Sequence, residues 1–200
     1  MGLRSAGAAA IFAVAVPAAA IPLEIVPNAA ADKNQKTEGE EMTEELSPSA
    51  RRVQEVLKGL GLNSRVQETG QMTRTAQDAA RAVGCEVGQI AKSLVFKGAA
   101  SQQAVLVITS GANRVNESAL AQVLGESILK ADADFVREKA GYAIGGVPPV
   151  GHPHPLTVFI DEDLLQYTHI WAAAGTPQAV FRLTPEELQR ITGGWVLRVK

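Results

Sequence analysis

The residue best placed to do chemistry in this chain is a lysine within an apolar strand. The segment 90–96 is short, apolar and bounded by glycines, which predicts a β-strand. Because side chains alternate along a strand, Lys92 shares one face with Ile90, Leu94 and Phe96, and we expect that face to meet the core. An ammonium group there is costly unless an anion or a water-filled pocket meets it. Lys92 is therefore a candidate site residue; the alternative is that it extends to solvent at a sheet edge.

A second candidate is the loop of residues 141–151, which contains four glycines and two prolines. Such a loop presents its backbone more than its side chains. The pair Gly145-Gly146 permits conformations that other residues avoid, and Pro148-Pro149 stiffens the chain after it. Rigid N–H groups can stabilise a carbonyl oxygen or an oxyanion, so we expect a substrate-binding role. The alternative is a tight helix-to-strand connection, which needs fewer than these eleven residues.

Other polar residues leave more than one interpretation open. Asp161 follows a predicted strand, where a carboxylate can line a cleft or cap a short helix. The turn at Gly175-Thr176 permits close approach of a ligand or of another backbone. His152 and His154 have no third ligand nearby in sequence, so we expect no metal site. No Ser-His-Asp or Cys-His arrangement is recognisable, so a hydrolase would activate water without a protein nucleophile.

The elements that must hold these residues alternate between helices and strands. Caps and apolar periodicity predict helices from Pro48, over 76–83, 117–124 and 132–140, and after Thr184. Strands are predicted over 64–68, 90–96, 104–109, 156–160, 170–173, 179–183 and 195–199. Because these elements follow one another in both αβ and ββ order, the sequence predicts a single α/β domain with a mixed sheet, and not a Rossmann or barrel pattern.

The composition of the chain changes sharply near residue 42. Residues 1–31 are rich in alanine, and their short apolar stretch resembles a weak secretory signal that proline interrupts too early to span a membrane. We interpret residues 1–41 as a signal-like or disordered tail, or as the product of an upstream start codon, and residues 42–200 as the working domain, acting in the cytoplasm. The latter carry 16 basic and 16 acidic side chains. That balance excludes a surface that coats nucleic acid along its length, although a local basic cluster could hold one end.

The lysine strand and the loop belong to an ordered set of segments spread over the chain. These segments are Thr75-Ala76, Ile90-Ala91-Lys92-Ser93-Leu94-Val95, Thr109, Asn116, Ala131-Asp132, Gly141-Tyr142-Ala143-Ile144-Gly145-Gly146-Val147-Pro148-Pro149-Val150-Gly151 and Phe159-Ile160-Asp161. Taken together, they resemble the YbaK family, which includes the inserted editing domain of bacterial prolyl-tRNA synthetase and its free-standing relatives. The resemblance covers roughly residues 46–198, and it depends on the ordered set more than on any single segment.

The resemblance implies a curved mixed β-sheet flanked by helices, and hydrolysis of the ester that joins a wrong amino acid to the 3′ end of a tRNA. It implies that Lys92 holds the terminal phosphate or ribose, and that the N–H groups of Gly145 and Gly146 fix and polarise the amino-acid carbonyl. The further residues that it places against the substrate are Thr75, Ile144, Val147, Pro148, Asp161, Gly175 and Thr176. It also implies that no metal or cofactor takes part, and that the substrate's own ribose hydroxyl aids the attacking water. Some relatives carry a histidine just after the Gly175 turn, where this chain has Gln178.

Two hypotheses of function follow from these residues. The first is a deacylase that acts in trans on mischarged tRNA, removing a small amino acid from tRNA-Pro or a related tRNA, with an aminoacyl-tRNA synthetase as a further partner and no membrane. The second is a non-catalytic module that binds a nucleotide or a tRNA end through the same lysine and loop. Turnover distinguishes them, because a module binds without releasing an amino acid.

Overall fold

The computed structural model describes residues 46–70 and 73–200. The predicted tail, residues 1–41, lies outside the described residues. The described helices are α1 (Pro48–Gly59), α2 (Ala76–Val83), α3 (Glu117–Leu124), α4 (Ala133–Ala140) and α5 (Pro185–Thr192), with 3-10 turns η1 (Val87–Gln89) and η2 (Glu162–Gln166). The strands are β1 (Val66–Glu68), β2 (Ile90–Gly98), β3 (Ala104–Ser110), β4 (Ile128–Lys130), β5 (Thr157–Asp161), β6 (Ile170–Ala173), β7 (Ala179–Leu183) and β8 (Trp195–Leu197). The sequence missed β4 and η1.

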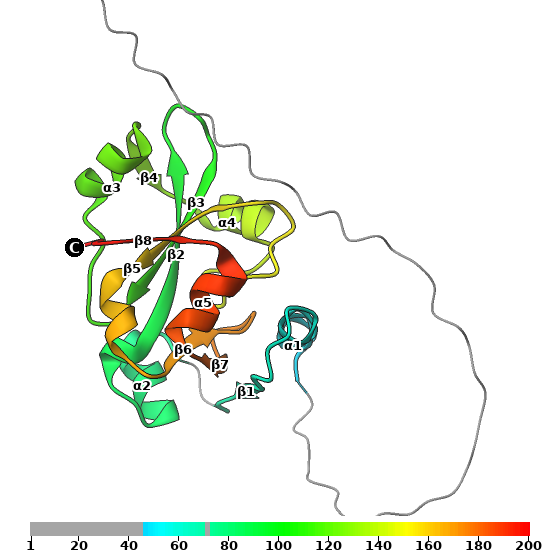
Figure 1. Ribbon diagram of the computed structural model, residues 1–200. Helices are drawn as coiled ribbons and strands as arrows, with labels where there is room; N and C mark the ends of the chain where they lie inside the picture. Colours follow the sequence, from blue (N-terminus) through cyan, green and yellow to red (C-terminus); the bar gives the residue numbers. More distant parts are fainter. Residues whose placement is uncertain (1–45, 71–72) are drawn as a thin grey trace, which may run out of the picture. The chain divides into compact units, whose positions relative to one another are not determined.

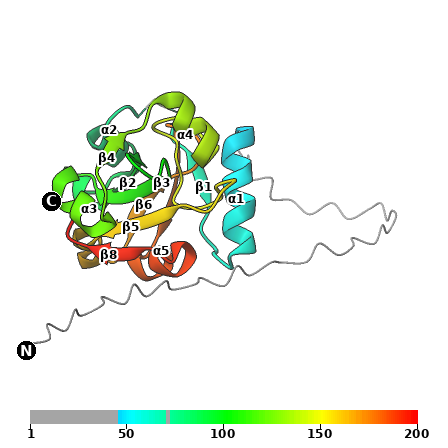
Figure 2. The same ribbon diagram turned by 90° about the horizontal axis from the view of Figure 1, so that it is seen from above.

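The strands of this part of the chain form one mixed sheet in the order β1-β7-β6-β2-β3-β5-β8, with β4 added beside β2 (Figure 1). The pairs β2–β6, β3–β5 and β5–β8 are parallel, and the other pairs are antiparallel. Helices lie on both sides of the sheet (Figure 2). The predicted fold class, a mixed-sheet α/β domain flanked by helices, is therefore confirmed.

Both faces of the sheet are buried, which corrects the expectation of a single core face. Leu106 and Ile108 of β3 pack into a larger cluster with α1 and α5, while Val105 and Val107 pack with α3 on the other face. In β2, Phe96 and the partly buried Leu94 join the smaller cluster. A central strand covered on both faces has a continuous apolar sequence, as β3 does. Lys92 therefore lies on the face of the smaller clusters.

One edge of β2 is only partly paired. β3 pairs with β2 along almost its whole length, from Ala91 to Lys97. On the other edge, β6 pairs with Ile90 and Ala91, and β4 pairs with residues 96–98. Among the described strands none pairs with this edge at residues 92–95, so its backbone groups there are open to another partner.

Most helix caps in the structure are the ones that the sequence predicts. Thr75 and Thr184 each form a capping box with the residue three positions later, and Asn116 and Asp132 each cap a helix with a side-chain oxygen. Ser47 precedes Pro48 as predicted but makes no side-chain cap, because its N–H donates to Glu68 and its hydroxyl has no partner among the described residues.

The loop after α4 is anchored by two aromatic rings. The hydroxyl of Tyr142 donates to the carbonyl oxygen of Gly151 at 3.2 Å, and the Tyr142 ring meets His152 edge-on. Nδ1 of His152 lies 3.1 Å from the carbonyl oxygen of Ala140, and its Nε2 is buried with no hydrogen-bond partner in the described chain. These contacts close residues 141–151 into a fixed loop, which can hold its N–H groups in place.

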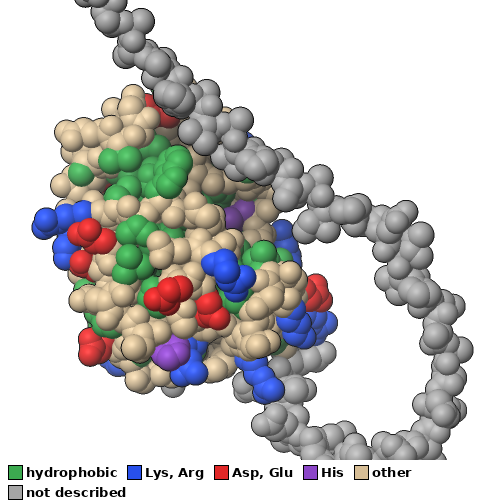
Figure 3. Space-filling model, viewed as in Figure 1, with side chains coloured by type: hydrophobic (Ala, Val, Ile, Leu, Met, Phe, Trp, Pro, Cys, Tyr) green, Lys and Arg blue, Asp and Glu red, His purple; other side chains and the backbone are tan. Residues whose placement is uncertain are grey.

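One face of the molecule does not concentrate charge of one sign. On the face seen in Figure 3, acidic and basic side chains are interspersed. This agrees with the equal numbers of acidic and basic residues after residue 41. Within residues 46–70 and 73–200, no helix is long and apolar enough to cross a bilayer.

Acid should weaken the anchor of this loop. Burial lowers the pKa of His152 below its ordinary value of 6.5, with a smaller effect of Arg52, and it outweighs the hydrogen bonds to the backbone of Ala140 and Pro149, which raise the pKa. The unfolded chain then binds the proton more readily, so stability is lost as the pH falls from about 6.5 through the folded-state pKa. We expect His152→Asn, whose amide can keep the bond to Ala140, to flatten this decline in thermal midpoints between about pH 7 and 5. Parallel curves for the two proteins would contradict it.

Candidate active site

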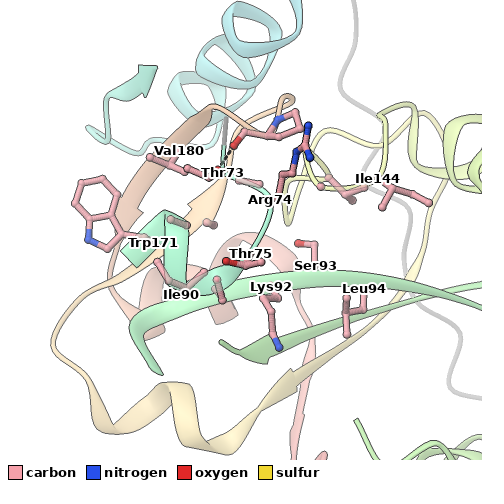
Figure 4. Close-up of a pocket in the computed structure, with 18 residues that line it drawn as sticks. Thr73, Arg74, Thr75, Ile90, Lys92, Ser93, Leu94, Ile144, Trp171 and Val180 are labelled. Carbon is pink, nitrogen blue, oxygen red and sulfur yellow. Dashed lines mark hydrogen bonds between the residues drawn. The ribbon is translucent and has the colours of Figure 1, made fainter. Parts of the chain in front are cut away.

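The main candidate site is a mostly apolar pocket of about 260 Å³ that opens at the unpaired edge of β2 (Figure 4). Its walls come from α2 and the residues before it, from β2, from the loop after α4 and from β6 and β7. The lining residues are Thr73, Arg74, Thr75, Ala76, Ala79, Ile90, Ala91, Lys92, Ser93, Leu94, Ile144, Gly145, Val147, Trp171, Ala172, Ala173, Pro177 and Val180. The structure therefore brings together Lys92, Thr75, Ile144, Gly145 and Val147, which the sequence placed in one site.

Lys92 lines the pocket with its stem while its ammonium group is held elsewhere. Its Nζ donates to the carbonyl oxygen of Asn113 at 2.8 Å. Figure 4 shows this nitrogen on the other side of the β2 ribbon from Thr75 and Ser93. Burial lowers the pKa of Lys92, Arg114 adds to the effect, and Asp161 opposes it. The ammonium is thus half-buried and only partly compensated, so an anion or a carbonyl oxygen would stabilise it.

Asp161 is a buried anchor and does not line the pocket, which differs from the position that the resemblance implied. Its Oδ2 accepts from the Thr109 hydroxyl, the Ser110 N–H and Nδ2 of Asn113 at 2.8–3.0 Å. Its Oδ1 accepts from the N–H of Asp163, so it also caps η2, as the alternative interpretation proposed. Because the same Asn113 accepts from Lys92, Asp161 acts on the site by fixing Asn113, in addition to the effect of its charge on the Lys92 ammonium.

The glycine-rich loop offers only one of the two N–H groups that were expected, that of Gly145, because the N–H of Gly146 is already bonded. The N–H of Gly146 donates to the carbonyl oxygen of Ala143 at 3.0 Å, and its own carbonyl accepts from Gly175 at 2.8 Å, so Gly146 holds the turn together. A Cβ at Gly146 would lie 2.7 Å from the Cα of Thr176, so only glycine fits there. Within the described residues, the N–H groups of Gly145 and Val147 have no hydrogen-bond partner. Both residues line the pocket, so their N–H groups are candidate donors to a ligand.

The turn at Gly175 and Thr176 supports the loop from behind. Neither residue lines the pocket; the next residue, Pro177, does. Gly175 has a φ of +92°, and a Cβ there would lie 2.7 Å from the carbonyl oxygen of Ser49. The hydroxyl of Thr176 accepts from the N–H of Ala179. Pro148 is buried behind the loop and also lies outside the lining. Gln178 is held by its carbonyl oxygen, which accepts from Thr69.

Three further side chains shape the pocket, and of these Ser93 was missed by reasoning from the sequence. Arg74 brings a second cation to the rim, between Thr73 and Ile144 in Figure 4. Ile144 is 59 % exposed at the rim of the pocket, so a ligand bound there would bury its apolar side chain. The hydroxyl of Ser93 is buried without a partner in the described part of the chain. Because side chains alternate along a strand, the sequence places Ser93 on the opposite face of the strand from Lys92. It does not show that residues from both faces line the same pocket.

The chemistry that this pocket can support is limited by what its described lining lacks. None of the described residues that line it is a carboxylate or a histidine. Among residues 46–70 and 73–200, no group of three or more His, Cys, Asp or Glu side chains is placed to hold a metal ion. Its donors to a ligand oxygen are two cations, the Ser93 hydroxyl, the Trp171 indole N–H and backbone N–H groups, because the hydroxyls of Thr73 and Thr75 already donate to Pro177 and Asp78. The site therefore suits a ligand with a carbonyl or phosphate oxygen and a small apolar part.

Comparison with known proteins agrees with this description. The family model for the aminoacyl-tRNA editing domain matches residues 71–191, more than half of the chain. The chain belongs to the aminoacyl-tRNA editing domain family. The segments that resembled the YbaK family lie mostly within the matched range, which contains both Lys92 and the 141–151 loop.

Individual relatives cover most of the described chain. A crystal structure described as that of a candidate trans-editing enzyme for prolyl-tRNA synthetase is 51 % identical, with a TM-score of 0.75, over 78 % of this chain and 99 % of that one. YwhH of Bacillus subtilis, an uncharacterized protein, is 30 % identical over 118 residues, which are 59 % of this chain and 74 % of that protein. EbsC of Enterococcus faecalis, named as a candidate Cys-tRNA(Pro)/Cys-tRNA(Cys) deacylase, is 28 % identical over 60 % of this chain and 73 % of its own length.

Removing one acceptor from the hydrogen-bond network beneath the pocket should lower the stability of the protein. In Asp161→Asn, an amide N–H₂ group replaces one of two oxygens that together accept four hydrogen bonds. A buried donor facing donors is left unsatisfied, so we expect the free energy of unfolding to fall by about 2–4 kcal/mol. Urea denaturation measures this. Asp163→Asn, at a more exposed neighbour, should cost less; equal losses would show that Asp161 is not the anchor.

The unpartnered Ser93 hydroxyl of the editing domain should contribute nothing to stability. Ser93→Ala removes a buried polar group that has no hydrogen-bond partner in the described chain. We therefore expect the free energy of unfolding to stay unchanged or to rise by up to about 1 kcal/mol. Thr109→Val is the contrasting variant, because the Thr109 hydroxyl donates to Asp161 and its loss should destabilise. A loss of more than about 1 kcal/mol in Ser93→Ala would reveal a bond that the free protein makes.

Proposed function

We propose that this protein is a trans-editing hydrolase that cleaves the ester between a small, wrongly attached amino acid and the 3′ end of a tRNA. Membership of the editing family supports the substrate class. The observation that carries the proposal is the pocket itself, in which Lys92 and the N–H of Gly145 border the same apolar space. The tRNA for proline, or a related one, is the leading candidate, because a solved relative at 51 % identity is described as serving prolyl-tRNA synthetase.

The pocket dimensions support a small amino acid. Its volume of about 260 Å³ is less than the range of about 300–1,000 Å³ typical of pockets that enclose drug-sized ligands. Ala76, Ala172 and Ala173 line it, and Val147 and Pro177 narrow it further. A short side chain would fit among these residues, and a large aromatic one would have to displace the 144–147 loop.

In the proposed reaction, water attacks the ester carbonyl carbon and the carbon–oxygen bond to the ribose breaks. The free N–H groups of Gly145 and Val147 would donate to the carbonyl oxygen as it gains negative charge. Lys92 would turn from Asn113 to the terminal phosphate or ribose and fix the ester over the loop. Since the described lining of the pocket contains no carboxylate or histidine, the proton of the attacking water would pass to the neighbouring hydroxyl of the substrate's own ribose. That hydroxyl gives its own proton to the ribose oxygen that is released when the ester bond breaks, so the products are the free amino acid and an intact ribose.

This function places the protein where mischarged tRNA is made, in the cytoplasm. A synthetase that produces the mischarged tRNA would be a natural partner, because the editing step competes with release of that tRNA to translation. No metal and no cofactor is required by the proposed reaction.

A binding module is the second candidate function. The half-buried ammonium and the free loop N–H groups would hold a nucleotide or an uncharged tRNA end equally well. Such a module would bind tRNA without releasing an amino acid. A trans-editing hydrolase would release the amino acid in the same assay.

The test is deacylation of a panel of tRNAs carrying alanine, serine, threonine or cysteine, with and without chelator. We expect release of one small amino acid, undiminished by chelator. Lys92→Met should reduce the rate by at least about 100-fold, because it removes the group that positions the ester. Its thermal midpoint should not fall, since burial lowers the pKa of Lys92 and its ammonium is already disfavoured in the fold.

The matched control is Lys97→Met on the same strand. Its ammonium lies 5.2 Å from the centroid of the Phe135 ring and borders no part of the pocket, so this variant should keep full activity. Equal activity of Lys92→Met and the wild type would remove Lys92 from the mechanism. Binding of tRNA with no release from any member of the panel would support the module.

A further inference from the structure

A second groove lies on the other side of Trp171 from the pocket. Its volume is about 590 Å³, and its lining is largely polar. The residues that line it are Gly61, Asn63, Ser64, Arg65, Gln67, His169, Trp171, Arg182, Leu183, Thr184 and Glu187. Trp171 lines both spaces, so the groove continues from the pocket where the ester would be cleaved.

The sheet places two arginines in a row with this tryptophan. Arg182 of β7 pairs with Trp171 of β6, which in turn pairs with Ile90 of β2. Continuing the register of Val66 and Phe181 by one residue brings Arg65 beside Arg182. The row Arg65–Arg182–Trp171–Ile90 therefore lies on one face of four neighbouring strands, which is also the face of Lys92.

The charge in the groove favours an anion. Arg65, Arg182 and His169 are exposed along it, and Glu187 is the acidic residue among those that line it. One carboxylate oxygen of Glu187 already accepts from the N–H of Thr184 in the cap of α5. Planar guanidinium groups bind phosphate through paired hydrogen bonds, and Gln67, Asn63 and Ser64 add neutral donors.

Trp171 adds a surface for stacking. Figure 4 shows its ring at the opposite end of the pocket from Ile144 and Leu94. The ring is partly exposed and packs against the cluster of Ala79, Ala80 and Ile90, which fixes its position. Stacked bases on aromatic rings with phosphates on nearby cations are the usual means of binding single-stranded nucleic acid without sequence readout.

We infer that this groove binds the single-stranded 3′ end of the tRNA, with a base stacked on Trp171 and the preceding phosphates on Arg182 and Arg65. The inference rests on the proposed function and extends it from the ester to the nucleotides that precede it. The terminal nucleotide enters the pocket past Lys92, and the strand leaves over Trp171 toward β7 and β1. The equal numbers of acidic and basic residues after residue 41 are compatible with this inference, because only the end of the polynucleotide has to bind to basic side chains.

The experiment compares two substrates of the full chain: an aminoacyl-tRNA and the same amino acid esterified to adenosine, which has no phosphate. The double variant Arg65→Gln with Arg182→Gln should raise KM for the aminoacyl-tRNA about tenfold and leave the adenosine ester unaffected. The slope of log(kcat/KM) against log salt should become shallower by about 0.7 for each phosphate that the variant no longer neutralises. Trp171→Leu should raise KM for the tRNA, and Trp171→Phe should restore it.

Arg198→Gln is the matched control, since Arg198 is exposed and follows β8 at the opposite edge of the sheet. Thermal midpoints verify that each variant is folded.

If the double variant and Arg198→Gln give the same KM and salt slope while both esters are cleaved, the assignment of the groove is overturned and the proposed hydrolase function stands. If the wild type cleaves neither ester, the proposed function fails. Binding of a short single-stranded RNA ending in CCA then decides the groove: weaker binding by the double variant supports it, and unchanged binding overturns it.

Discussion

β2 is paired along almost all of one edge by β3, but along only the two ends of its other edge, by β6 and β4. Backbone groups left open between them must meet a loop, water or a ligand. The structure uses this interval for the pocket, with Lys92, Ser93 and Leu94 on one wall and residues 144–147 opposite. The site thus depends on an incomplete ladder in an otherwise continuous sheet, and its position follows from where β6 ends and β4 begins.

The polar network beneath the pocket explains how a lysine is kept there. Asp161 is fully buried and joins Thr109, Ser110 and Asn113, and the carbonyl of Asn113 then receives the Lys92 ammonium. Asn113 also donates to Asp163, which pairs with Lys200 near the end of the chain. The buried carboxylate of Asp161 is stable there because its two oxygens accept four hydrogen bonds. The network holds Lys92 by a single hydrogen bond to a neutral carbonyl, a bond that an anionic ligand could replace.

Two glycines have different roles in the loop. Gly146 packs backbone to backbone against Gly175 and Thr176 and donates its N–H within its own turn, so it fixes the loop. Gly145 and Val147, on either side, line the pocket, and their N–H groups have no partner among the described residues. A rigid turn with adjacent free donors is what stabilisation of a developing oxyanion requires, because the donors need not reorganise as charge appears. The same rigidity depends on Tyr142 and His152 at the ends of the loop.

The amino-acid sequence by itself determined most local elements and some of the residues that line the pocket. Caps at Thr75 and Thr184, the apolar run of β3 and the lysine at 92 are readable because helix ends, strand periodicity and a charge among apolar residues are local signals. The tertiary structure alone decided which groups face the ligand. It turned Gly146 inward, placed Asp161 below the pocket, brought Trp171 and Arg74 to it, and added β4 beside β2. These outcomes depend on strand register and on contacts between residues distant in sequence, which no local pattern encodes.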